Sequence, residues 1–537
     1  MRTPLLVLSV AFALLPALAP VLSAAEPPTL ELRLDDAIAT ALGKNVDLRV
    51  ERENVVIADA NVERARGAYD PSFRLDARYR DRTDPVNSIL SGAPAGEVGP
   101  TTSGFLLAGS LAQLLPTGAT LSLASSVGRD VSNSVFGLLS PSYATSVGVE
   151  LRQPLLQNRS IDAARRVLRV ARIDRERSGA NLARAVAETV AAVEKAYWTL
   201  TAARKEVEAR ASAVALADDQ RTDVKARFEA GVLSEADLAA PAAELERRKG
   251  DLYGAEEAAT RAENALKSFL AADPADALWR GRIVPLDTAS PPAAVSGDAD
   301  TERALATADA ERPEIAEARA RVSRAAVDEE AARSRLLPQL DLVGAYAARG
   351  LSGSKNPGAT NLLPVPVVVP EALDGGLGRS YGTLVDNRFP DASIGLSLGI
   401  PIGNRAAKGD LAVARSARLQ AESAVVLARH RVAVEVLNAL AALRSAAARF
   451  EAARAGREAA ETLLHSENER FAAGTTTPFF VLTRQNDLTQ ARIAEVAALA
   501  DQRKALVELA RAKGTILAER NVRIEEKKPA PPAGGSR

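Results

Sequence analysis

The amino-acid sequence predicts a mixed α/β membrane protein built from two internal structural repeats, each combining outer-membrane strands with very long helices. Three observations lead to this prediction: an export signal at the start, an order of motifs that occurs twice, and helical stretches too long for a globular core. The composition agrees, because apolar residues make up 47% of the chain and aromatic residues only 4%. Slim side chains allow long helices to pack closely along their length.

Charge and residue counts exclude several classes of function. Lysine plus arginine and aspartate plus glutamate both number 68, so no overall basic field exists and we expect no nucleic-acid partner. The chain has no cysteine, which removes disulfides, thiolate metal sites and cysteine nucleophiles. His430 and His465 lie apart in alanine-rich helical sequence, so neither predicts a metal site or a catalytic triad. We therefore expect no enzyme activity, no metal and no cofactor.

Residues 1–25 predict a secretory signal peptide. An apolar run from Leu5 to Leu22 follows Arg2 and ends in small residues, so we expect cleavage near Ala25. A membrane anchor is the alternative, and the two prolines inside the run disfavour it. No later segment approaches about 18 uninterrupted apolar residues, so the mature chain should lack a transmembrane helix.

One order of motifs occurs twice along the chain. The matching pairs are Asp36–Ala41 with Arg303–Ala308, Pro71 with Pro338, Ser146–Gly148 with Ser393–Gly395, and Arg227–Gly231 with Arg470–Gly474. The matches keep their order, and the spacing between them changes only in loops, so we expect two structural copies. The predicted divisions are repeat 1 at 26–272, a crossing segment at 273–300, repeat 2 at 301–517 and a disordered tail at 518–537.

Each repeat is expected to begin with a helix and to end with a long helical hairpin. The predicted helices are 35–68, 161–228 and 234–270 in repeat 1, and 301–336, 407–471 and 478–517 in repeat 2. The longest helices have no internal proline and would span about 100 Å. The shorter helices are each about half as long, so two of them could stack end to end, antiparallel to the long one. Pro241 predicts a kink or a late start in its helix.

Period-two alternation predicts β-strands between the first and second helices, within about 71–153 and 338–401. The clearest segments are Phe73–Tyr79, Val147–Arg152, Leu340–Tyr346 and Ile394–Ile400. A soluble sheet would explain any one of them, but the export signal and the repeat favour the outer membrane. Two strands per repeat cannot close a barrel, so the chain must oligomerise to seal its sheet edges.

The strand regions also contain a hairpin whose position the sequence does not decide, and several segments that predict loops. The hairpin at Phe105–Ser125 either adds two membrane strands or folds at the rim. The segments 81–103, 127–141 and 351–389 are rich in Gly, Pro, Ser and Asn and predict external loops. Three copies of four or six strands would supply about twelve or eighteen.

Taken together, the motifs resemble those of the TolC-type outer-membrane efflux protein family over nearly the whole mature length. The matching motifs are Leu34–Ile38, Gln153–Leu156, Ala196–Trp198, Arg312–Ile315, Leu337–Leu340, Ile400–Ile402 and the Phe-x-x-Gly turns Phe228–Gly231 and Phe471–Gly474. The resemblance implies a homotrimer whose outer-membrane β-barrel, of about twelve strands, continues into a long periplasmic α-helical barrel.

The same resemblance implies the function and the partners. The chain would be the outer-membrane exit duct of a tripartite efflux or type I secretion system in a Gram-negative bacterium. It would passively conduct small molecules or proteins from an inner-membrane pump, joined by a periplasmic adaptor protein, and it would contact outer-membrane lipid. An exported periplasmic coiled-coil scaffold without channel activity is the alternative.

The resemblance also assigns site residues at the turns of the two long hairpins. The adaptor-docking residues would be Ala230, Gly231, Val232, Leu233, Ser234, Ala473, Gly474, Thr475, Thr476 and Thr477. Some family members close the duct with carboxylates just after the second turn, where this chain has Phe480 and Thr483. Rings of Phe480, with Phe479, would close the tip by apolar contact, and Asp237 keeps an acid after the first turn. The alternative is that the phenylalanines pack between hairpins.

Overall fold

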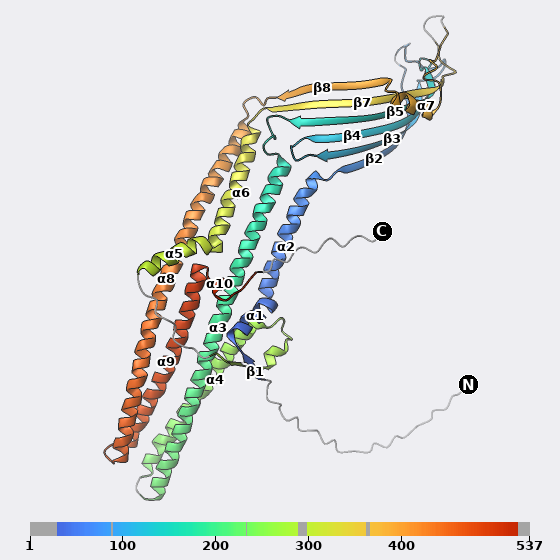
Figure 1. The fold of residues 1–537 in the computed structure, drawn as a ribbon. Coiled ribbons are helices and arrows are strands. Elements are labelled where there is room, and N and C mark those ends of the chain that lie inside the picture. Colours follow the sequence, from blue (N-terminus) through green and yellow to red (C-terminus); the bar gives the residue numbers. More distant parts are fainter. Residues whose placement is uncertain are drawn as a thin grey trace, which may run out of the picture. The chain divides into compact units, whose positions relative to one another are not determined.

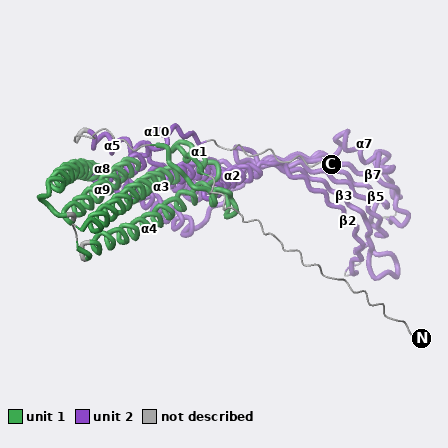
Figure 2. Tube along the Cα trace, turned by 90° about the horizontal axis from the view of Figure 1, so that it is seen from below, with its two compact units in different colours: residues 1–46, 189–294, 443–507 green, residues 47–188, 295–442, 508–537 purple. Residues whose placement is uncertain are grey.

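The computed structural model describes residues 29–86, 88, 90–231, 234–287, 298–360 and 366–524. The predicted signal peptide, part of the crossing segment 273–300 and most of the tail 518–537 lie outside these residues. The chain divides into two compact units, coloured in Figure 2. Unit 1 comprises 1–46, 189–294 and 443–507, and unit 2 comprises 47–188, 295–442 and 508–537.

Unit 2 contains an antiparallel sheet of six strands in the order β2-β3-β4-β5-β7-β8 (Figure 1). The strands are β2 Ser72–Thr83, β3 Thr101–Leu114, β4 Thr120–Ser132, β5 Leu139–Pro154, β7 Gln339–Lys355 and β8 Phe389–Gly399. The hairpin of β3 and β4 joins the sheet, which settles the question that the sequence left open. The first repeat therefore supplies four strands and the second repeat two, which is the larger of the two strand counts that the sequence left open.

The predicted loops were too long at several ends. β3 begins at Thr101, β4 runs to Ser132, and β7 continues to Lys355. The segment 351–389 also contains a helix, α7 at Leu377–Val385. Serine and glycine pair as ordinary strand residues here because neighbouring strands take up their backbone hydrogen bonds.

The two faces of this sheet differ in polarity. One row of directly paired residues crosses all six strands: Phe73, Leu111, Leu123, Val149, Tyr346 and Ala392. The large side chains of this row are exposed, and we call this side the apolar face. The opposite face carries charged residues, including Arg152 and Asp341, which form an ion pair at 2.7 Å. Apolar-out alternation of this kind is typical of a membrane β-barrel wall.

The helices of unit 2 are joined by ion pairs. They are α2 Val46–Arg66, α5 Asp298–Glu311, α6 Pro313–Arg335, the first part of α3 Ala163–Glu229 and the first part of α8 Arg405–Ala472. Arg175 of α3 pairs with Asp59 of α2 at 3.0 Å. Arg166 of α3 pairs with Asp328 of α6 at 2.7 Å. These bridges set the lateral neighbours of each helix, although exposed pairs add little stability singly.

Two helices predicted as continuous are broken. The predicted helix 35–68 is split at Asn45 into α1 Leu34–Lys44 and α2, because Asn45 has an extended ψ of 128°. The predicted helix 301–336 is split at Arg312, since Pro313 begins a new helix at its first turn. The last long helix, α9 Pro478–Lys513, ends before the predicted residue 517 because Gly514 adopts a φ of 80°. A short helix, α10 Ile516–Glu519, follows it.

Unit 1 holds the ends of both long hairpins that carry the turns. It includes α1, α4 Ala236–Leu270, most of α9 and the later parts of α3 and α8. Pro241 lies inside α4, which starts at Ala236. A parallel pair of short strands, β1 Thr29–Leu32 and β6 Arg282–Pro285, packs beside these helices and was missed by the sequence reading. Among the described residues, no helix combines the length and apolarity needed to span a membrane.

Candidate functional site in the helical hairpin turns

Both long helices end at a glycine in the left-handed region. Gly231 follows α3 with a φ of 77°, and Gly474 follows α8 with a φ of 73°. Their amides donate to Phe228 O at 2.9 Å and to Phe471 O at 3.1 Å, which closes each turn. A Cβ at either glycine would have nothing within 4 Å. Glycine is therefore favoured here by the backbone conformation and not by a lack of space.

The second turn is fastened to its own helix by threonines. The amide of Thr475 donates to Arg470 O at 3.0 Å, and the Thr476 hydroxyl donates to Glu467 Oε1 at 2.6 Å. Ala473, Gly474, Thr475 and Thr477 are exposed, so the structure places a small, uncharged surface at this turn.

The first turn is described only in part. Ala230, Gly231 and Ser234 are exposed, whereas Val232 and Leu233 lie outside the described residues. Asp237 falls in the first turn of α4, and its side chain is likewise outside the description.

Within unit 1, a side-chain contact brings the two hairpins together close to their turns. The guanidinium carbon of Arg227, at the end of α3, lies 5.0 Å from the centre of the Phe471 ring, at the end of α8. A cation above a ring face at this distance is attractive. The ends of α3 and α8, which lead into the two predicted docking turns, therefore lie side by side.

Phe479 and Phe480 follow the second turn and are both exposed, by 67% and 50%. Their rings meet edge to face at 5.7 Å, and the Phe480 amide donates to Thr477 O at 3.1 Å. The Thr483 hydroxyl donates to Phe479 O at 2.9 Å, so it is engaged by its own helix. Within one chain, the phenylalanine rings remain largely exposed.

Ion pairs fix the helices of the second hairpin beyond the turn. Arg457 of α8 pairs with Glu495 of α9 at 2.6 Å, and Arg492 of α9 pairs with Glu461 of α8 at 3.1 Å. The hydrogen bond from Arg492 holds the pKa of the Glu461 carboxyl below its ordinary value, so this acid stays charged at neutral pH.

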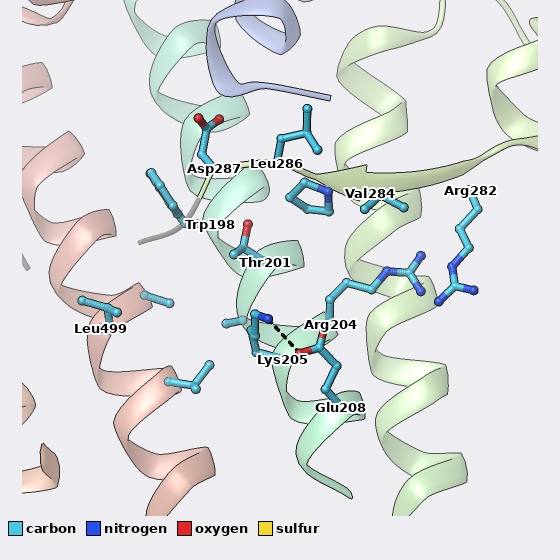
Figure 3. A pocket seen from close by; sticks show the side chains of 14 residues that line it. Trp198, Thr201, Arg204, Lys205, Glu208, Arg282, Val284, Leu286, Asp287 and Leu499 are labelled. Atoms are coloured by element: carbon cyan, nitrogen blue, oxygen red, sulfur yellow. Dashed lines mark hydrogen bonds and ion pairs between the residues drawn. The ribbon is translucent and has the colours of Figure 1, made fainter. Parts of the chain in front are cut away.

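A second feature of unit 1 is a cavity of about 440 Å³ between α3, α9 and β6 (Figure 3). Its wall includes Trp198 and Leu499, and its rim carries Arg204, Lys205 and Arg282. Arg204 is paired with Glu263, and Lys205 with Glu208 at 2.7 Å. The sequence reading missed this cavity because β6 was not predicted.

Tyr197, next to Trp198, explains part of the Ala196–Trp198 motif. Its buried hydroxyl bonds to Leu32 O at 3.0 Å and Asp287 Oδ2 at 2.8 Å, which ties α3 to β1 and to the segment that follows β6. Burial raises the pKa of Tyr197 to about 12, so the hydroxyl keeps its proton at neutral pH. Any stability linked to this shift is present below the ordinary pKa of 10.0 and lost as the pH rises through about 12.

We expect Tyr197→Phe to destabilise the β1 and β6 region by about 1–3 kcal/mol. Leu32 O and Asp287 Oδ2 would lose the one hydroxyl proton that they share, and the Asp287 amide would lose the hydroxyl oxygen to which it donates at 3.2 Å. Amide exchange at β1 and β6 measures this locally. Thr201→Val is a control, since its hydroxyl bonds only Tyr197 O of its own helix in the described contacts. Unchanged exchange in Tyr197→Phe would contradict the assigned role.

The described residues contain no cluster of His, Cys, Asp and Glu able to hold a metal ion.

The model of the outer membrane efflux protein family matches residues 110–272 and 304–515 of this sequence. The chain belongs to the outer membrane efflux protein family. A search of curated proteins found no match.

Solved structures share the fold of this efflux protein at low sequence identity. The CmeC outer membrane channel of Campylobacter jejuni is 17% identical with a TM-score of 0.59, covering 90% of this chain and 86% of that one. VceC of Vibrio cholerae is 15% identical with a TM-score of 0.59, covering 90% and 96%. The MtrE channel of Neisseria gonorrhoeae is 19% identical with a TM-score of 0.57, covering 90% and 89%.

The family confirms the predicted fold class and function. This efflux protein is a two-repeat outer-membrane β-barrel chain with a periplasmic helical extension, and it serves as the exit duct of an efflux system. Its family and structural neighbours are channel proteins. A scaffold without channel activity is not favoured.

Proposed function

We propose that the efflux protein works as a homotrimeric duct whose two hairpin turns dock a periplasmic adaptor, which joins it to an inner-membrane pump. The open sheet carries this proposal. β2 and β8 each pair with one neighbour only in the described sheet, so both edges need a partner strand. An unpaired edge in lipid is costly, and a second and third copy of the same sheet would satisfy it.

The strand count sets the size of the proposed barrel. Three sheets of six strands supply about eighteen strands, rather than the roughly twelve implied by the family resemblance. Because barrel diameter grows with strand number, we infer a wider exit than a twelve-stranded barrel would give.

Mass measurement in mild detergent tests the assembly. We expect a complex of three chains, because closing the sheet with copies of itself removes every edge. A stable monomer that inserts into the membrane would refute the trimer. Variants at Gly231 and Gly474, which are altered only in unit 1, should still form complexes of three chains.

The docking turns are proposed as Ala230–Ser234 and Ala473–Thr477. Their support is geometric: the described residues of both turns are exposed except the half-buried Thr476, and Arg227 and Phe471 bring the two hairpins into contact beside them. We further propose that Phe479 and Phe480 narrow the periplasmic end by apolar contact. Asp237 is the acid that this chain keeps after the first turn. Thr483 lies at the same end but contributes little to closure, because its hydroxyl is bonded within its own helix.

The chain divisions are part of the same proposal. The signal peptide would direct the chain into the export route and be removed near Ala25. Repeats 26–272 and 301–517 would each supply one long hairpin. Mass spectrometry of the mature N-terminus tests the cleavage. An intact residue 1 in membrane-inserted protein would contradict it.

A further inference from the structure

Helix α7 lies on the apolar face of the sheet, at the ends of β5 and β7 away from α6 (Figure 1). Thr145 is two and four residues from Val147 and Val149, so its side chain points to that face. Its register partner Gly350 sits close beneath α7, where a Cβ would collide with the Ser380 carbonyl. Thr145 is only 3% exposed because α7 covers it.

The polarity of α7 is the reverse of that expected for a helix covering a sheet in water. The most buried side chains of α7 are Ser380 and Thr383, which are 0% and 2% exposed, and the half-buried Leu384 also lies over the sheet, beside Gly350. The large apolar side chains Leu377, Tyr381 and Val385 are exposed, by 39%, 45% and 79%. In water an amphipathic helix turns its apolar stripe inward.

Hydrogen bonds satisfy the polar groups beneath the helix. The hydroxyls of Ser380 and Thr145 are 3.0 Å apart, and Ser352 Oγ donates to Gly376 O at 2.9 Å. The Thr383 hydroxyl donates to Ser380 O at 2.9 Å and lies 3.1 Å from the Leu351 amide. A helix paired in this way can enter a region of low polarity without stranding its polar groups.

The exposed side of α7 has the chemistry of a membrane interface. Its stripe of Leu377, Tyr381 and Val385 continues the apolar face, which carries Ile394 and Leu396 further along the sheet. Tyrosine is favoured at the level of lipid headgroups. Arg379, the only charged residue in α7, is exposed and makes no ion pair within the described part of the chain.

We propose that α7 is an interfacial helix embedded in the outer leaflet of the outer membrane. Leu377, Tyr381 and Val385 lie among the first acyl carbons, and Arg379 binds the phosphate of an anionic lipid headgroup. This rests on the outer-membrane location of the sheet. It adds a lipid-binding site at the rim that the barrel strands alone do not supply.

The absence of cysteine from the sequence allows a clean test with single-cysteine variants carrying an environment-sensitive dye. Val385→Cys probes α7, Ile394→Cys the sheet's apolar face and Glu371→Cys the exposed loop before α7. The full-length protein is reconstituted in vesicles whose phospholipids carry a nitroxide at the headgroup or deep in the acyl chain.

We expect Val385→Cys to be quenched most by the headgroup nitroxide, Ile394→Cys most by the deep nitroxide, and Glu371→Cys by aqueous iodide only. Quenching of Val385→Cys by iodide and by neither nitroxide would overturn the proposal. Loss of nitroxide quenching in Ile394→Cys as well would instead contradict the membrane location of the sheet.

The headgroup contact is tested in the Val385→Cys background with a small fraction of nitroxide-labelled anionic phospholipid. Quenching should exceed that expected from the bulk lipid fraction, and Arg379→Gln should reduce it to the bulk level. Arg388→Gln is the matched control, because Arg388 is engaged by Asp386 at 3.5 Å and lies beyond α7. Equal quenching in Arg379→Gln and wild type would remove the assigned phosphate contact.

Discussion

Gly231→Asp and Gly474→Asp are each expected to abolish export while the protein still assembles in the outer membrane. A Cβ at either glycine meets nothing within 4 Å, so the new carboxylate would project from the turn into the proposed docking surface. An unpaired charge buried in an interface costs about 3–5 kcal/mol, which corresponds to more than a hundredfold weaker docking. Export of a pump substrate, together with adaptor cross-linking, measures the effect.

Gly231→Asn and Gly474→Asn are the matched controls for backbone strain. Asparagine and aspartate are nearly the same size and both tolerate a φ near the observed 77° and 73°, but asparagine adds no charge. We expect the asparagine variants to keep most export. If both aspartate variants cross-link and export normally, the turns do not dock the adaptor. If asparagine and aspartate fail equally, turn geometry and not charge is what matters.

Phe480→Ala is expected to raise single-channel conductance severalfold by widening an apolar constriction at the periplasmic end. The motivating observation is that Phe480 remains 50% exposed in the chain and stacks edge to face with Phe479, so its ring is free to meet other copies. An apolar ring of this kind obstructs ions by excluding water. Planar-bilayer recording of the purified trimer gives the measurement.

Two further variants separate the apolar gate from a charged one. Thr483→Ala should leave conductance nearly unchanged, since the Thr483 hydroxyl bonds the Phe479 carbonyl of its own helix. Asp237→Asn should also have little effect, and multivalent cations should block weakly. Unchanged conductance in Phe480→Ala, with opening in Asp237→Asn, would show that charge holds the gate and that Phe480 only packs the wall.

The long helices and their turns were readable from the sequence because the signals are local. An uninterrupted run without proline predicts a helix, and a glycine at its end predicts a left-handed turn; Gly231 and Gly474 both adopt one. Breaks inside helices were harder to predict from the sequence. Pro313 at a helix start looks much like Pro241 inside α4, and only the neighbouring backbone distinguishes them.

Strand number was not readable for a different reason. The predicted hairpin arm that includes Ser122–Ser125 carries serine in a weakly alternating pattern, which does not tell a membrane strand from a hairpin at the rim. It joins the sheet because β3 and β5 take its backbone hydrogen bonds on both sides. The short strands β1 and β6 pair across a large sequence separation, so no local pattern signalled them.

The sequence by itself determined the membrane class, the twofold repeat and the two glycine turns, since each depends on composition or on nearest neighbours along the chain. Only the tertiary structure decided the six-stranded sheet, the meeting of Arg227 with Phe471 and the outward apolar stripe of α7. These depend on which surfaces meet in space. The amphipathic pattern of α7 predicts a polar and an apolar face on the helix. Only the packing of α7 on the sheet shows that the polar face is the buried one.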